Sequence, residues 1–156
     1  MRNLKTLLTS GLIIGVCLVS ALPAVAATKT PDPNADLLAQ IKTLTQTEKG
    51  LADQLTSLDI QTQRKIARAQ KNFAALLAAK NDQISFEPDN TTARAYRLTL
   101  EKDNIQLQID RQAKNATNIT ADMNIVITDL NNLIGARTQL IKDGQQILAD
   151  LSVSAT

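Results

Sequence analysis

The stretch ISFEPDNTT, residues 84–92, interrupts a sequence that otherwise has helical patterning from about residue 35 to residue 151. Pro88 has no backbone N–H to donate to a helix, and the four residues after it are Asp, Asn, Thr and Thr, which are common in turns and at helix N-termini. This is the strongest break inside the patterned region. We therefore interpret residues 84–92 as the turn of a helical hairpin.

Before this turn, apolar residues recur at intervals of three and four, which is typical of a helix with a coiled-coil seam. The first members are Leu37, Ile41, Leu44, Leu51, Leu55 and Leu58. The pattern continues to Leu76, and Glu48 occupies one seam position. It predicts a first helix over residues 35–83.

After the turn, two interleaved columns of residues seven apart keep one phase to the end of the patterned region. One column is Ile105, Gln112, Ile119, Val126, Leu133, Leu140 and Ile147, and the other is Ile109, Ala116, Met123, Leu130, Arg137, Gly144 and Leu151. The unbroken phase predicts one second helix over residues 92–151. Poor helix formers at residues 115–120 leave an alternative, a break near Asn118 that would give a three-helix bundle.

The predicted fold is therefore all-α, an elongated antiparallel two-helix hairpin like a coiled coil, over residues 35–151. When the two predicted helices fold back on each other about the turn at residues 84–92, Leu140 falls opposite Ala35, where the first helix begins. The apolar residues after Leu140 therefore overhang without an intrachain partner. The register also places Glu48 near Ile127 and away from Arg137. Because an apolar overhang indicates an interface, we expect a homo-oligomer or an envelope protein as partner. The candidate interface residues are Ile127, Ile134, Leu140, Ile141, Ile147, Leu148 and Leu151.

Basic side chains gather near the predicted turn and form a second candidate surface. They are Arg64, Lys65, Arg68, Lys71, Arg94 and Arg97. Such a basic face would attract acidic clients or surfaces. The alternative is a solvated face, with Asp82, Asp103 and Asp110 among its local ion-pair partners.

The first 26 residues have the three parts of a signal peptide. Arg2 and Lys5 supply the positive charge, residues 7–21 are apolar, and residues 24–26 read Ala-Val-Ala, a typical cleavage site. We expect an exported protein, periplasmic in the first place and extracellular as the alternative. The mature chain would have an extended leader at residues 27–34, the hairpin, a tail at residues 152–156 and no transmembrane span.

Composition restricts the chemistry of the mature chain. The sequence has no His, and its only Cys is Cys17, inside the predicted signal peptide. A His-paired nucleophile is therefore absent, the carboxylates lack EF-hand spacing, and we expect no catalysis, metal or cofactor. Removing Arg2 and Lys5 from the 17 basic residues leaves 15, which equals the 15 acidic residues. This balance does not favour nucleic-acid binding.

The sequence thus predicts an exported, non-enzymatic protein that self-associates or binds another cell-envelope protein, as a structural or adaptor subunit of the kind found in secretion machinery. The alternative is a periplasmic, ATP-independent holdase chaperone that uses the basic face. In size and class the chain resembles the small periplasmic stress chaperones. This chain lacks their LTxxQ repeats. Two segments begin with Leu-Thr, at residues 44 and 55, but Glu48 and Asp59 stand where the repeat has Gln.

Overall fold

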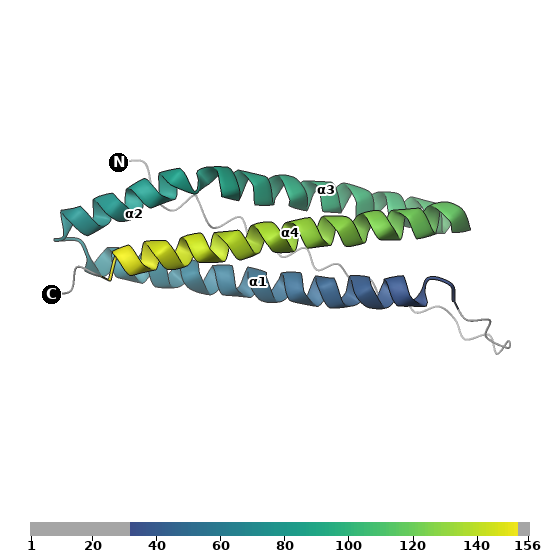
Figure 1. Cartoon of the computed structure of the whole chain (residues 1–156), viewed down its shortest axis with the longest axis horizontal. Coiled ribbons are helices and arrows are strands. Elements are labelled where there is room, and N and C mark those ends of the chain that lie inside the picture. Colours follow the sequence, from purple (N-terminus) through teal and green to yellow (C-terminus); the bar gives the residue numbers. More distant parts are fainter. Residues whose placement is uncertain (1–31, 153–156) are drawn as a thin grey trace.

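The computed structural model describes residues 32–152, which form four helices. These are α1 (Ala35–Arg68), α2 (Phe73–Ser85), α3 (Glu87–Gln112) and α4 (Ala116–Asp150). Figure 1 shows α2 and α3 following one another as a single bent rod, with α4 lying between this rod and α1. The all-α class is confirmed, whereas the two-helix hairpin is wrong. The predicted signal peptide, leader residues 27–31 and tail residues 153–156 lie outside the described residues.

The chain reverses at two asparagines and not at Pro88. The side chain of Asn72 accepts a hydrogen bond from the Ala75 N–H at 3.1 Å and begins α2. Asn115 does the same for α4 with the Asn118 N–H at 3.3 Å, after Lys114 adopts a left-handed φ of 56°. The alternative break near Asn118 therefore lies close to the observed interruption at residues 113–115.

The predicted turn at residues 84–92 is instead the bend between α2 and α3. Pro88 lies in the first turn of α3, where its missing N–H removes no hydrogen bond. Phe86 has φ −93° and ψ 0°, a right-handed conformation that bends the rod without reversing it. A proline there is compatible with continuing in the same direction, which is why it did not mark a hairpin turn.

Contacts between α1 and α4 fix their direction and register. The Thr120 hydroxyl donates to Asn34 Oδ1, Arg137 Nη1 donates to the Glu48 carbonyl, and Lys65 donates to the Ser152 hydroxyl, with partners 86, 89 and 87 residues apart. A nearly constant separation means that α1 and α4 run parallel. The α2–α3 rod runs antiparallel to both (Figure 1).

The core follows from this three-rod packing. One cluster joins α1, α3 and α4 and contains Ile41, Leu107, Met123, Val126 and Leu130. A second cluster lies where α4 ends against α2 and contains Ala79, Ile147 and Leu151, with Ile66, Ala69, Leu76 and Phe86 packed against it. The expected apolar overhang at the end of α4 is therefore wrong, because α2 covers it.

Candidate functional site

The surface between the α2–α3 rod and α4 contains four facing pairs of aspartates, which we call the aspartate ladder. The pairs are Asp82 with Asp150, Asp89 with Asp143, Asp103 with Asp129, and Asp110 with Asp122. From one pair to the next, the aspartate on the α2–α3 rod lies seven or fourteen residues later in the sequence, and its partner on α4 lies the same number of residues earlier. One rung of this series is missing, at the level of Tyr96 and Ala136.

Within each pair the carboxyl groups are close enough for a hydrogen bond if one of them carries a proton. Within residues 32–152, no donor reaches Oδ2 of Asp82, Asp122, Asp129 or Asp143. Ionised carboxylates only accept hydrogen bonds, so two facing carboxylates leave both acceptors unsatisfied. Protonating one member supplies the missing hydrogen and removes the repulsion.

The pKa values reflect this arrangement. Burial, which is the largest cause, and the facing Asp103 carboxyl together raise the pKa of Asp129 to about 6, against the opposing effect of Lys102. Asp129 is 8% exposed. Burial together with the facing carboxyl also raises the pKa of Asp82 and of Asp122. Burial is likewise the largest cause of the raised pKa of Asp143.

Amide side chains decide which member of one pair keeps the charge. Gln106 Nε2 donates to Asp110 Oδ2 at 2.8 Å, and Asn118 Nδ2 donates to Asp110 Oδ1 at 3.2 Å. These hydrogen bonds lower the pKa of Asp110, while burial beside it raises the pKa of Asp122. In this pair Asp110 therefore holds the negative charge, and Asp122 is the member that takes up a proton.

The ladder has proton-binding rather than metal-binding geometry. Each rung has two carboxyl groups, and in residues 32–152 no three His, Cys, Asp or Glu side chains gather closely enough to hold a metal ion. A pair that shares one proton couples folding to pH. The ladder is thus an acid-responsive contact along one helix interface.

The ladder was not predicted from the sequence, in which three of its members were interpreted as ion-pair partners of basic residues. A signal was present, since Asp recurs at intervals of seven or fourteen on both sides of the break at residues 113–115. Recognising it requires the antiparallel packing of α3 on α4, and the hairpin model placed one continuous helix there. The predicted pairing of Asp82, Asp103 and Asp110 with the basic face is not what the structure shows across this interface.

Glu48 and Arg137 form an ion pair between α1 and α4, contrary to the predicted register. Arg137 Nη2 lies 2.7 Å from Glu48 Oε1, and the two side chains are 16% and 19% exposed. Burial lowers the pKa of Arg137, and the Glu48 carboxylate opposes this effect. The parallel packing of α1 on α4 brings these two seam positions to the same level.

We expect Glu48→Ala to lower the free energy of unfolding by about 1–3 kcal/mol, because it leaves the guanidinium largely buried without its carboxylate. Glu48→Ala combined with Arg137→Leu should recover part of that loss, since no unpaired charge remains. Urea unfolding of the two single variants and the double variant gives the coupling energy. Additive losses would contradict the pairing.

The outer face of the α2–α3 rod carries a line of exposed apolar side chains, which we call the outer stripe. Its members are Phe73, Leu77, Ile84, Leu98, Ile105 and Ile109, between 52% and 78% exposed. At 100° per residue, these positions fall within about 40° of one line along the rod. Thr91 lies on the same line, midway along it. The outer stripe is thus an exposed line of apolar side chains that no other described helix covers, with Lys80, Glu87, Thr91 and Lys102 interspersed along it.

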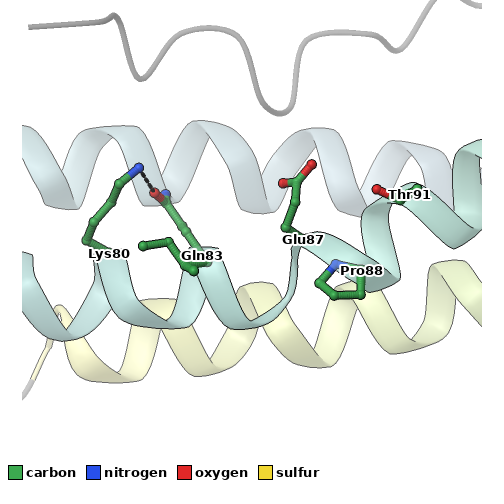
Figure 2. A pocket seen from close by; sticks show the side chains of 6 residues that line it. Lys80, Gln83, Glu87, Pro88 and Thr91 are labelled. Carbon is green, nitrogen blue, oxygen red and sulfur yellow. Dashed lines mark hydrogen bonds between the residues drawn. The ribbon is translucent and has the colours of Figure 1, made fainter.

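A shallow pocket lies on the outer stripe at the α2–α3 bend. Its lining residues are Lys80, Gln83, Ile84, Glu87, Pro88 and Thr91. Figure 2 shows them following the rod from α2 across the bend into α3, with Lys80 Nζ donating to Gln83 Oε1 at 3.4 Å. These residues supply no nucleophile–base pair. The pocket is therefore a shallow hollow on the exposed face of the rod, lined by residues from both sides of the bend.

The structure buries three of the seven predicted interface residues within the bundle and leaves four half-buried. Ile141, Ile147 and Leu151 are buried within the chain, between 6% and 9% exposed. The other four, Ile127, Ile134, Leu140 and Leu148, are half-buried. The exposed apolar surface of the described residues lies mainly on α2 and α3, and it includes Ile105 and Ile109, which were predicted to lie in the seam.

The predicted basic face is divided between two places. Arg64, Lys65, Arg68 and Lys71 lie at the end of α1, where Lys65 donates to the Ser152 hydroxyl. Arg94 and Arg97 lie on α3, where Arg97 Nε contacts Glu101 Oε1 at 3.4 Å. The packing of the rods places Arg94 of α3 at the same height as Leu51 of α1. Because Leu51 is thirteen residues from Arg64 along α1, the two groups of basic residues are roughly 20 Å apart. The holdase function stays an untested prediction.

No family model, curated protein or solved structure matches this chain. Among residues 32–152, none of the helices has a segment apolar and long enough to cross a bilayer.

Proposed function

We propose that this chain is an exported, non-enzymatic protein that acts by associating with a helical partner through the outer stripe. The partner is a second copy or another protein of the cell envelope. The single observation that supports this proposal is the exposure of six large apolar side chains in one line on the α2–α3 rod. The working surface is thus α2–α3, in place of the end of α4.

The size of the stripe supports an interface. From Phe73 to Ile109 the rod is about 54 Å long at 1.5 Å per residue, and a helix contact is about 10 Å wide. The resulting footprint of roughly 540 Å², which also includes Lys80, Glu87, Thr91 and Lys102, is similar in extent to the largest surface patches of monomeric proteins, which are often functional. The spacing of 3.5 residues favours another helix as the occupant.

Composition supports the non-enzymatic part of the proposal. The chain has no His, and its one Cys lies in the predicted signal peptide. The clustered carboxyl groups are packed between helices in the aspartate ladder, away from the outer stripe. The export part rests on residues 1–26, as argued from the sequence.

A photo-crosslinking amino acid at Leu98, in the full chain expressed in its cell of origin, tests this function. Leu98 is 60% exposed on the stripe, and Ile125, which is 47% exposed on α4, is the matched control. We expect adducts from Leu98 and none from Ile125. Leu77→Ser with Ile105→Ser should abolish the adducts, because these changes remove neighbouring apolar contacts. Absence of any adduct at Leu98, with self or foreign protein, would contradict the proposal.

A further inference from the structure

We propose that the outer stripe binds the outer stripe of a second copy, antiparallel, about a two-fold axis that passes beside Thr91. This inference rests on the proposed function and deepens it by naming the partner and the register. It is carried by the order of apolar and charged residues along the exposed face of α2–α3.

The apolar residues of the stripe are symmetric about Thr91. Ile84 and Leu98 lie seven residues to either side, Leu77 and Ile105 fourteen, and Phe73 and Ile109 eighteen. In a two-fold antiparallel pair, each residue meets the one at the same distance on the other side of the axis. Every apolar member of the stripe would therefore face an apolar member of the second copy. Two copies packed in parallel would not require the apolar residues to be spaced symmetrically about one position.

Charges along one edge of the stripe fit the same axis. Lys80, Glu87, Arg94 and Glu101 are spaced seven residues apart and alternate in sign. A two-fold axis perpendicular to the rods brings this edge of one copy against the same edge of the other. Glu87 then lies level with Arg94 of the second copy, within about one residue's rise of 1.5 Å, and Lys80 with Glu101.

The axis thus forms four intermolecular ion pairs on this edge, two between Glu87 and Arg94 and two between Lys80 and Glu101. Lys80, Glu87 and Arg94 are exposed, and Glu101 is half-buried beside Arg97. Lys102, on the other edge, lies eleven residues after Thr91 and therefore comes level with Lys80 of the second copy, a like-charge contact that the ion pairs have to outweigh. Electrostatic complementarity of this kind selects one register over others.

The area is sufficient for a modest dimer. Full coverage of the footprint of roughly 540 Å² on both copies sets an upper limit of about 1,100 Å², near the ~1,000 Å² expected of a biological interface. Figure 1 shows the α2–α3 rod bowing away from α1 and α4 near its bend, so the middle of the stripe projects furthest. Ile84 and Leu98 should therefore contribute most, and we expect association at micromolar concentration.

Sedimentation equilibrium of the mature chain tests the dimer and its register together. We expect a monomer–dimer equilibrium that Ile84→Ser with Leu98→Ser abolishes and that the matched off-stripe pair Ile60→Ser with Ile125→Ser leaves unchanged. Glu87→Arg should weaken association about five- to tenfold, because the introduced guanidinium would face Arg94 of the second copy twice. Adding Arg94→Glu should restore it, since reversing both charges re-forms the pairs across the axis.

Disulfide trapping provides a second readout. The mature chain has no cysteine of its own, so Thr91→Cys should oxidise to a covalent dimer at the axis, whereas Thr138→Cys, exposed on α4, should not. A monomer at all micromolar concentrations, no rescue by the charge reversal, or equal trapping at both positions would overturn the dimer. Leu98 adducts with a foreign protein alone would also overturn it, yet they would support the proposed function.

Discussion

The folded chain is expected to be more stable at pH 5 than at pH 7.5, which is the reverse of ordinary acid denaturation. The cause is the aspartate ladder, in which burial and a facing carboxyl raise the pKa of one member of each pair. A group with a raised pKa in the folded state binds protons more tightly there than in the unfolded chain. Lowering the pH therefore favours folding until the unfolded chain is protonated too.

Asp129 sets the scale of the effect. Its pKa rises from 3.8 to about 6, so its contribution is complete below about pH 4 and is lost as the pH rises through 6. At 1.36 kcal/mol per unit, the full difference is on the order of 3 kcal/mol, of which roughly 1.4 kcal/mol is regained by pH 5. This corresponds to an increase in Tm of about 5 °C from Asp129 alone. Asp82, Asp122 and Asp143 add in the same direction.

Thermal melts between pH 4.5 and 8 measure this dependence. Asp129→Asn keeps the shape of the side chain and removes the like charge facing Asp103, so it should stabilise the chain at pH 7.5 by roughly 2 kcal/mol and flatten the profile. Asp53→Asn, at an exposed position on α1, is the control and should leave the profile unchanged. A wild-type Tm that falls between pH 7.5 and pH 5 would show that the ladder does not behave in this way.

Helical content could be predicted from the sequence, and so could the buried face of α4. The heptad columns correctly include Met123, Val126, Leu130, Leu133 and Ile147, all buried. Each lies within one uninterrupted helix, where a spacing of three and four residues fixes which side chains share a face. Within such a segment the pattern alone identifies the core.

The same columns fail where they cross a break. Ile105 and Ile109 are 59% and 52% exposed although they keep the phase of α4. Residues 113–115 leave the helix, so the phase of α4 no longer determines the face of α3. The pattern of the first predicted helix, which runs through Phe73 to Leu76, fails in the same way, because residues 69–72 interrupt the helix and Phe73 is 78% exposed. The heptad spacing in one helix therefore cannot predict which side chains of the next helix are buried when a non-helical turn separates the two.

The turns and the ladder were hidden for different physical reasons. Asn72 and Asn115 cap helices, yet neither has a proline or glycine beside it to mark a reversal. The ladder places like charges against each other, an arrangement that costs free energy at neutral pH and that local patterning therefore argues against. Only the packing of α3 against α4 reveals it.

Leu107→Ala is expected to cost the most stability of any substitution considered for this chain. Leu107 is 1% exposed and packs in the cluster that joins α1, α3 and α4. Truncating a fully buried leucine removes its apolar burial and leaves a cavity, which together lower the free energy of unfolding by about 2–5 kcal/mol.

Ile105→Ala, two residues away on the same helix, is the matched comparison. The hairpin model puts Ile105 in the seam and Leu107 outside it, whereas in the three-rod bundle Ile105 is exposed and its truncation should change stability by no more than about 0.5 kcal/mol. Chemical denaturation at submicromolar concentration separates the two, because a dimer held by the outer stripe would be dissociated there. If Ile105→Ala proved the costlier change, α3 would have to be rotated about its axis and both the core and the outer stripe reassigned.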